Sequence, residues 1–235
     1  MLKLDRVSVD IAGIPVLRGI TAQFESSATY AIVGRNGAGK TTLLRTIMGF
    51  TNVRAGTLQL AGVDLLSKPS FARAALGVGY APEDRVLFPT MSVEDNLRLP
   101  CEAIGMHPAD VRLRLKEAID AVPQIEAMLP RSASALSGGQ GKIAALARAL
   151  MVATRVLLVD EPLQGLAPAL AKQFVEAIAR LHRLRPSLCV LITESNRALL
   201  AGLDCTTFVL ERGELHATSN HAQGRVTADS AAIRS

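Results

Sequence analysis

The spacing of apolar residues changes twice along the chain and divides the sequence into three regions. Residues 2–30 alternate between apolar and polar positions and contain the turn residues Gly13 and Pro15, a pattern that predicts short antiparallel strands. The segment 57–60 continues this pattern after a glycine. From residue 92 to about residue 127 the apolar positions fall at helical spacing. Prolines are expected to divide this stretch into short helices, at Pro100, Pro108, Pro123 and Pro130.

The third region contains two short runs that are apolar on both faces, residues 156–159 and 190–192. Such runs are typical of central parallel strands that helices cover on both sides. A helix is predicted between them, over residues 168–184, and residues 207–215 are expected to form a terminal hairpin. The tail from residue 218 to 235 is small, polar and rich in alanine, so it is predicted to be flexible.

Charge and composition narrow the possible partners. The chain has 235 residues and a formal net charge of +5, which is compatible with binding to nucleic acid or to an anionic membrane surface. However, the arginines are scattered and only 3% of the residues are aromatic, so few side chains could stack on bases and no nucleic-acid partner is expected. Three cysteines without a C-x-x-C pair suit a reducing compartment. Arg148 and Arg155 interrupt the richest apolar stretch, so no transmembrane span is predicted.

A glycine-rich segment carries the first candidate chemistry. It fits the pattern G-x-x-x-x-G-K-[ST] and reads Gly34, Arg35, Asn36, Gly37, Ala38, Gly39, Lys40, Thr41. An apolar run at 30–33 leads in as a strand, and a helical stretch that stops at Gly49 leads out. Glycines let backbone N–H groups point inward at a phosphate chain, and the helix N-terminus adds its positive dipole end. Lys40 is expected to reach the β- and γ-phosphates, Thr41 to hold Mg²⁺, and Thr42 to complete an ATP site.

Two acidic residues follow the apolar run 156–159, in the arrangement known as Walker B. Asp160 is expected to coordinate Mg²⁺ directly or through water, and Glu161 to polarise the attacking water. An apolar run that ends in Asp-Glu is weak evidence alone. Together with Lys40 upstream, it predicts hydrolysis of the bound nucleotide.

A third motif lies about twenty residues before Walker B. It consists of Leu136, Ser137, Gly138, Gly139 and Gln140, and a helix is predicted to follow from Lys142 to Met151. Small residues at a helix N-terminus make a second edge that favours anions. A flexible linker is the alternative interpretation, and the apolar helix that starts at once argues against it.

This pentapeptide, between the glycine-rich segment (the P-loop, or Walker A motif) and Walker B, resembles the signature of ABC ATPases. The resemblance to this family covers roughly residues 2–215. The resemblance implies an α/β fold: a P-loop core with a parallel sheet, an antiparallel β subdomain and an α-helical subdomain at about 92–150, within a domain spanning 2–217. It also implies that two ATPase subunits meet head to tail. Ser137, Gly138, Gly139 and Gln140 would then contact the ATP held by a neighbour's P-loop, and exchange of nucleotide would drive membrane partners.

Several short sequence segments resemble those of the second ATPase subunit of branched-chain amino-acid importers. They include the segments 80–83 and 87–97, the segment 160–168, and Glu194 with Asn196. Glu83 stands where most ABC ATPases carry the Q-loop glutamine, which implies a role for it in catalysis and near Mg²⁺. The same branch imports urea, short amides and aromatic acids. The implied partners are a second ATPase, two transmembrane permeases and, indirectly, a periplasmic binding protein, at the cytoplasmic face of the inner membrane.

Two positions depart from the family pattern. The aromatic residue that usually stacks on adenine is replaced by Ile11, which could cover one ring face only. The switch residue after the last core strand is Ser195, whose short hydroxyl would contact the γ-phosphate only through water. Two alternatives to a working transport ATPase follow: a partner that hydrolyses ATP poorly, or an ABC ATPase outside transport.

Overall fold

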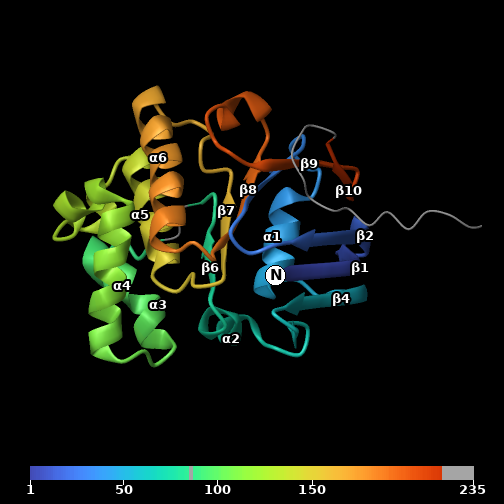
Figure 1. The fold of residues 1–235 in the computed structure, drawn as a ribbon, viewed down its shortest axis with the longest axis horizontal. Coiled ribbons are helices and arrows are strands. Elements are labelled where there is room, and N and C mark those ends of the chain that lie inside the picture. The colour runs from blue at the N-terminus through green and yellow to red at the C-terminus, as the bar shows by residue number, and fades with distance from the viewer. Residues whose placement is uncertain (85–86, 219–235) are drawn as a thin grey trace, which may run out of the picture.

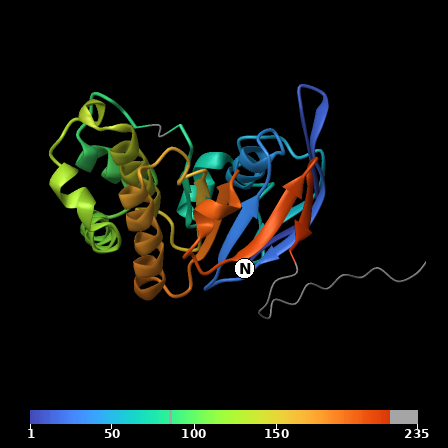
Figure 2. The ribbon, with the colours of Figure 1, turned by 90° about the horizontal axis from the view of Figure 1, so that it is seen from above.

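The computed structural model describes residues 1–84 and 87–218 (Figure 1). The predicted flexible tail, apart from Thr218, lies outside these described residues. Figures 1 and 2 show helices gathered at one side of the molecule and two sheets at the other. Within the described residues, no helix combines the length and the apolar character needed to cross a membrane.

One sheet is antiparallel, as residues 2–30 predict. Its strand order is β2-β1-β4-β5. The bounds are β1 Leu2–Ile11, β2 Ile14–Phe24, β4 Ala55–Leu60 and β5 Val63–Asp64. The first two strands are longer than predicted, because β1 continues through three shifts of register against β2.

The other sheet has the order β10-β9-β3-β8-β7-β6. Every neighbouring pair in it is parallel except β9 with β10, which form the predicted terminal hairpin. The bounds are β3 Thr29–Val33, β6 Val78–Ala81, β7 Val156–Asp160, β8 Cys189–Glu194, β9 Thr206–Glu211 and β10 Glu214–Ala217. The two runs that are apolar on both faces, β7 and β8, are adjacent in the interior of this sheet.

Alternate residues of β7 explain why the run is apolar throughout. Leu157 and Val159 pack into a core with the helices, whereas Val156 and Leu158 pack into a second core on the opposite side. The second core also contains Leu43 and Ile47 of α1 (Lys40–Met48) together with the buried residues of the antiparallel sheet. The P-loop helix is therefore held firmly between the two sheets.

Helices cover the other face of the parallel sheet. They are α3 Val93–Ala103, α4 Pro108–Ala121, α5 Gly138–Leu150 and α6 Pro168–Leu184, with the short elements α2 Ser70–Ala75, η1 Pro123–Met128, η2 Ala133–Ala135 and η3 Arg197–Leu200. Pro108 and Pro123 stand at the starts of α4 and η1, where a proline is tolerated. Pro100 does not end a helix as expected. It lies inside α3, whose buried residues Val93, Leu97 and Cys101 hold the helix against the core.

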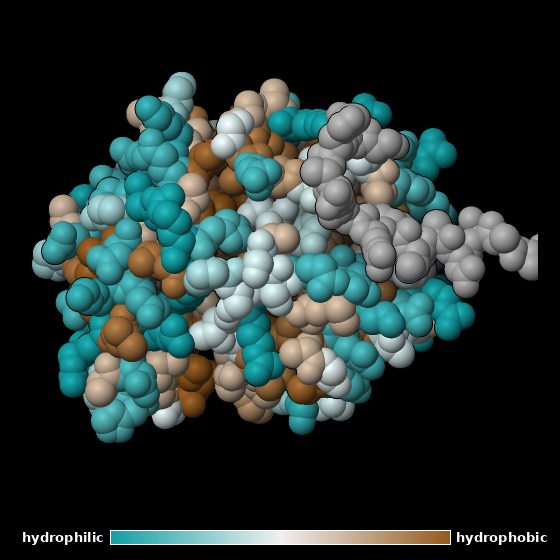
Figure 3. All heavy atoms as spheres, viewed as in Figure 1, coloured by the Kyte–Doolittle hydropathy of each residue, from teal (hydrophilic) through white to brown (hydrophobic). Residues whose placement is uncertain are grey.

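Hydrophilic residues cover most of the face seen in Figure 3. A narrow gap lies there between the helical part and the region of α2. Residues of α1, α2, α3, α5 and β6 line a cavity of about 630 Å³.

Candidate functional site

The glycine-rich loop lies between the end of β3 and the start of α1, at the carboxyl edge of the parallel sheet. Gly37 and Gly39 have φ angles of 81° and 106°, which only glycine adopts readily. A Cβ on Gly39 would also lie 3.0 Å from the Leu17 side chain, so close packing excludes a larger residue. The loop frames a cavity of about 250 Å³. Its lining residues are Asn36, Gly37, Gly39, Lys40, Thr41 and Thr42, with Val16, Glu83, Glu161 and Gln164.

Lys40 is buried at the bottom of this loop and forms an ion pair with Glu161. Lys40 Nζ lies 3.0 Å from Glu161 Oε1, and the two side chains are 4% and 6% exposed. Lys40 also donates to the carbonyls of Gly34 and Arg35, at 2.7 and 3.2 Å. The second carboxylate oxygen of Glu161 is buried and has no hydrogen-bond partner among the described residues. The fold therefore brings the two predicted active residues, 121 positions apart in sequence, into direct contact.

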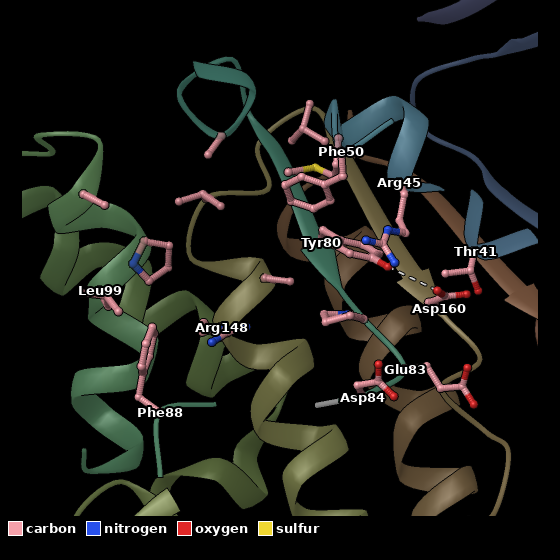
Figure 4. A pocket seen from close by; sticks show the side chains of 18 residues that line it. Thr41, Arg45, Phe50, Tyr80, Glu83, Asp84, Phe88, Leu99, Arg148 and Asp160 are labelled. Carbon is pink, nitrogen blue, oxygen red and sulfur yellow. Dashed lines mark hydrogen bonds between the residues drawn. The ribbon is translucent and has the colours of Figure 1, made fainter. Parts of the chain in front are cut away.

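Asp160 is fixed by two hydroxyl groups. Thr193 Oγ1 donates to Asp160 Oδ1 at 2.6 Å, and the Tyr80 hydroxyl donates to Oδ2 at 3.2 Å (Figure 4). Burial, and then the Asp160 carboxylate, raise the pKa of the Tyr80 phenol, so it stays protonated and remains a donor. No role is predicted for Tyr80 or Thr193 from the sequence. The sequence signal that could have indicated these contacts is the position of both hydroxyl residues near the carboxyl ends of parallel strands that flank the strand of Asp160.

Glu83 follows β6 and faces the same space, where it lines both the P-loop cavity and the larger cavity. Partial desolvation raises the pKa of the Glu83 carboxyl, and the nearby Glu161 and Asp160 carboxylates raise it further. Three carboxyl groups thus converge beside the Thr41 hydroxyl, and Figure 4 shows Thr41 next to Asp160.

This donor set fits Mg²⁺ only in part. Oxygen ligands are what Mg²⁺ prefers, and Thr41 and Asp160 supply them. Among the described residues, however, no group of three or more His, Cys, Asp or Glu side chains could hold a metal ion by itself. The remaining ligands would have to be phosphate oxygens and water, which is the usual arrangement for Mg²⁺ at nucleotide sites.

The motif from Ser137 to Gln140 forms the start of α5, which begins at Gly138 and not at Lys142 as predicted. The reason is a capping box: Ser137 Oγ accepts from the Gln140 N–H, and Gln140 Oε1 accepts from the Ser137 N–H. A Cβ on Gly139 would lie 2.4 Å from Leu170 Cδ1, so the Leu170 side chain would have to shift to admit a larger residue. None of Ser137, Gly138, Gly139 and Gln140 lines the P-loop cavity of this chain.

The structure does not bring Ile11 or Ser195 to the walls of the P-loop cavity. Ile11 ends β1, pairs with Ile14 and is 44% exposed. Val16 of β2 lines the cavity, and its carbonyl and side chain, with the Leu17 side chain, lie close to Gly39. Ser195 follows β8 and is half-buried. A role of Ile11 at the base and of Ser195 at the phosphate stays a prediction.

Glu194 is a buried carboxyl group that the sequence analysis matched to a family pattern but did not place in the site. Its side chain is fully buried. Oε1 accepts from the Leu163 N–H at 2.7 Å, whereas Oε2 has no partner among the described residues. Burial raises the pKa of this carboxyl to about 7, and Glu161 acts in the same direction, against the opposing effects of the Leu163 N–H and of Lys142 and Lys40.

Because of this raised pKa, Glu194→Gln should change the unfolding free energy of the nucleotide-free protein by an amount that depends on pH. The folded protein holds a proton on Glu194 up to about pH 7, whereas an unfolded glutamate loses it near pH 4.5. The wild type therefore loses stability as pH rises from 4.5 through 7, and the glutamine variant does not. Between pH 5 and pH 8 the difference in unfolding free energy should move in favour of Glu194→Gln by on the order of 2 kcal/mol. Denaturant unfolding at both pH values measures it, and a difference that does not change with pH would contradict the assignment.

Comparisons with known proteins agree with this geometry. The family model described as "ABC transporter" matches residues 17–164, which include all three motifs. The chain belongs to the ABC transporter family. It is therefore an ABC-type ATPase that binds ATP, as the sequence analysis predicted.

Several curated relatives align with this ABC ATPase along nearly its whole length. One is the probable branched-chain amino acid transport ATP-binding protein LivF of Archaeoglobus fulgidus, 32% identical over 94% of this chain and 93% of that protein. Another is the high-affinity branched-chain amino acid transport ATP-binding protein BraG of Pseudomonas aeruginosa, 30% identical over 92% and 91%. The putative 2-aminoethylphosphonate import ATP-binding protein PhnT of Salmonella typhimurium is 32% identical over 96% of this chain and 62% of that protein.

Solved structures confirm the predicted fold class. A dimeric bacterial ABC transporter cassette superposes on this ABC ATPase with a TM-score of 0.80 at 20% identity, covering 92% of this chain and 96% of that one. An ATP-binding subunit of an ABC transporter gives a TM-score of 0.78 at 24% identity, over 92% and 88%.

Proposed function

We propose that this chain is the ATP-hydrolysing subunit of an importer for branched-chain amino acids or a related small solute such as urea, an amide or an aromatic acid. The observation that carries the substrate class is the full-length similarity to LivF and BraG, both named as branched-chain amino acid transport proteins. The relative named for 2-aminoethylphosphonate is matched over less of its length.

The geometry supports a sequence of roles in hydrolysis. Lys40 exchanges the Glu161 carboxylate for the β- and γ-phosphates when MgATP enters the cavity. This exchange frees Glu161, whose second oxygen is already without a partner among the described residues, to accept a proton from the attacking water. Thr41 and Asp160 would hold Mg²⁺, which would supply positive charge to neutralise the phosphates. Glu83, from the loop after β6, orients water or metal at the open side of the site.

A second ATPase subunit completes the site in this proposal. Ser137 and Gly138 are exposed and lie outside the P-loop cavity of their own chain, which supports their use by a neighbour in a head-to-tail pair. A solved ABC transporter cassette with this fold is dimeric. Because Ser195 is short and Ile11 cannot stack like an aromatic ring, we infer that the natural partner is a fuller relative and not a second copy.

Unequal roles for Ser137 and Ser195 give a testable difference. In the assembled transporter, Ser137→Glu should lower ATP turnover by about a hundredfold or more, because a bulky anion beside the neighbour's γ-phosphate prevents the head-to-tail pair from closing over both nucleotides. Ser195→Ala should lower turnover by less than about threefold, because a hydroxyl that acts only through water contributes little. Steady-state ATPase assays on both variants measure this, and a larger loss from Ser195→Ala would contradict the unequal pair.

Permease subunits are proposed to dock at the larger cavity, with the chain held at the cytoplasmic face of the inner membrane. This cavity is mainly apolar, and Phe50 and Phe88 on its walls are about half exposed. It also reaches Glu83 and Thr41, as Figure 4 shows. A segment bound there would contact the loop that carries Glu83, so binding and hydrolysis would be linked.

Reconstitution tests the importer function. The chain should be co-expressed with two permeases and the second ATPase of a branched-chain amino-acid importer, the complex placed in proteoliposomes, and the matching binding protein added. Leucine-loaded binding protein should stimulate ATP hydrolysis and drive leucine uptake. Stimulation by binding protein loaded with urea, an amide or an aromatic acid would support the importer function and assign it a different substrate. Hydrolysis that no loaded binding protein stimulates would contradict the function.

A further inference from the structure

The loop that leaves β7 carries Glu161 in an unusual backbone conformation. Glu161 has a φ angle of 43°, in the left-handed region that a non-glycine residue keeps only where its surroundings fix it. One side of this residue is fixed by Thr193, because the Glu161 N–H donates to both the Thr193 carbonyl and its Oγ1 at 3.1 Å. The conformation determines where the Glu161 carboxylate points, so whatever holds the loop also sets the reacting geometry.

Lys142 holds the other side of the same loop. Its Nζ donates to the carbonyl of Glu161 at 2.7 Å and to the carbonyl of Gln164 at 2.8 Å. Charge-assisted hydrogen bonds of this length are stronger than those between neutral groups. Lys142 belongs to α5, the helix whose first turn presents the Ser137 motif. The Lys142 side chain therefore connects two parts of the site. One is the Ser137 motif, which is proposed to contact a neighbour's nucleotide, and the other is the loop that carries Glu161 beside this chain's own nucleotide.

Glu194 contacts the loop from β8. Its fully buried Oε1 accepts the Leu163 N–H at 2.7 Å, between the two carbonyls that Lys142 contacts along the chain. Burial of a carboxyl group is costly unless it is well bonded, and Leu163 is the only hydrogen-bond partner of this carboxyl in the part of the chain that the structure describes. Lys142 from α5 and Glu194 from β8 thus both form hydrogen bonds to the backbone of residues 161–164.

We propose that Lys142 and Glu194 are positioning residues for hydrolysis, which hold the 161–164 loop between α5 and β8 and pass the position of the Ser137 motif to Glu161 of the same chain. The inference rests on the proposed function, because it takes Glu161 as the group that accepts the proton. When α5 closes on a neighbour's nucleotide, Lys142 carries that movement to Glu161. Each site then responds to the state of the other.

Substitution of Lys142 tests the proposal first. Lys142→Met keeps the stem of the side chain and removes its donors. In the assembled transporter it should lower kcat by roughly ten- to a hundredfold, the cost of a misplaced reacting group, while KM for ATP stays within about twofold. Lys142→Arg should restore most of the rate, because a guanidinium also donates to two carbonyls. The matched control is Lys172→Met on α6, where the lysine is 80% exposed and paired with Glu176, and its rate should equal wild type.

The Glu194 pair gives the second test. Glu194→Gln keeps an acceptor for the Leu163 N–H, whereas Glu194→Ala removes it, so the alanine variant should show the lower kcat by about tenfold at unchanged KM. If Lys142→Met does not fold, this pair decides by the same criteria. Unchanged kcat in Lys142→Met and Glu194→Ala, or a parallel loss of kcat and ATP affinity that the conservative variants do not restore, would overturn the proposal.

Glu161→Gln in the same assay distinguishes a failure of the positioning role of Lys142 and Glu194 from a failure of the proposed role of Glu161 in hydrolysis. If Glu161→Gln stops turnover while Lys142→Met and Glu194→Ala do not slow it, only the positioning role fails. If Glu161→Gln leaves turnover unchanged, the assignment of Glu161 fails and the positioning role fails with it.

Discussion

Lys40→Ala should weaken MgATP binding by more than about a hundredfold, or roughly 2.7 kcal/mol. Lys40 is the one cationic side chain on the wall of the P-loop cavity, among the described residues, and it lies at the start of α1 with its ammonium already held inside the loop. Loss of this charge removes the cationic side chain that this cavity offers to the β- and γ-phosphates. Calorimetric titration of the purified chain with MgATP measures the change.

Two variants control this result. Lys172→Ala removes an exposed lysine from α6 and should leave the affinity unchanged. Glu161→Gln removes the carboxylate that pairs with Lys40, so it should bind MgATP at least as tightly as wild type. Wild-type affinity in Lys40→Ala would show that the cavity beside Gly37 and Gly39 is not the nucleotide site.

Glu161→Gln should lower the rate of hydrolysis by roughly a hundred- to a ten-thousandfold, the usual contribution of a general base. The amide keeps the volume of the side chain and its backbone bonds to Thr193, so the loss comes from the missing proton acceptor and not from a rearranged loop. Together with retained binding, the expected pattern is a protein that holds ATP and does not turn it over.

Steady-state ATPase assays measure this effect on a transporter complex whose partner ATPase is silenced by a glutamine in place of its own catalytic glutamate. Glu176→Gln on α6 is the matched control at an exposed glutamate. A Glu161→Gln complex that retains more than about a tenth of the wild-type rate would assign the proton acceptor to another group. Glu83 is then the next candidate, because it lines the same cavity.

Much of this site followed from local sequence pattern. The strand, loop and helix around Lys40, the paired central strands and the helix Pro168–Leu184 all match their predicted positions. These elements have strong periodicity and clear boundary residues: Gly49 at the end of α1 and Pro168 at the start of α6. Where pattern and tertiary packing agree, the prediction is accurate.

The misses arose where contacts distant in sequence decide the outcome. The register of β1 against β2 shifts three times, so counting back from the P-loop does not show which residue of this hairpin lies over the cavity. Val16 reaches the cavity wall, and a contact of Ile11 with the base stays a prediction. Pro100 stays helical because the packing of α3 outweighs the missing N–H. The capping box that moves the start of α5 to Gly138 was readable in principle, because glutamine stands three residues after Ser137.

The roles of Lys142 and Glu194 were not predictable in the same way. A lysine on a helix is usually a solvated residue, and nothing local indicates that its ammonium reaches two carbonyls of a loop about twenty residues away. A glutamate at the end of an apolar strand gives no sign of whether it points to solvent or inward. Only the adjacency of β7 and β8 and the packing of α5 bring these groups to Glu161.

The central claim is that this chain hydrolyses ATP in its own P-loop site with Glu161, completed by a partner's signature motif. The most direct measurement silences the partner ATPase by a glutamine in place of its own catalytic glutamate, and then follows release of phosphate from the transporter complex. With this chain as wild type, turnover should continue, and with Glu161→Gln it should fall by at least about a hundredfold. Absence of turnover from the complex that holds the wild-type chain, or equal turnover with and without Glu161, would contradict the account.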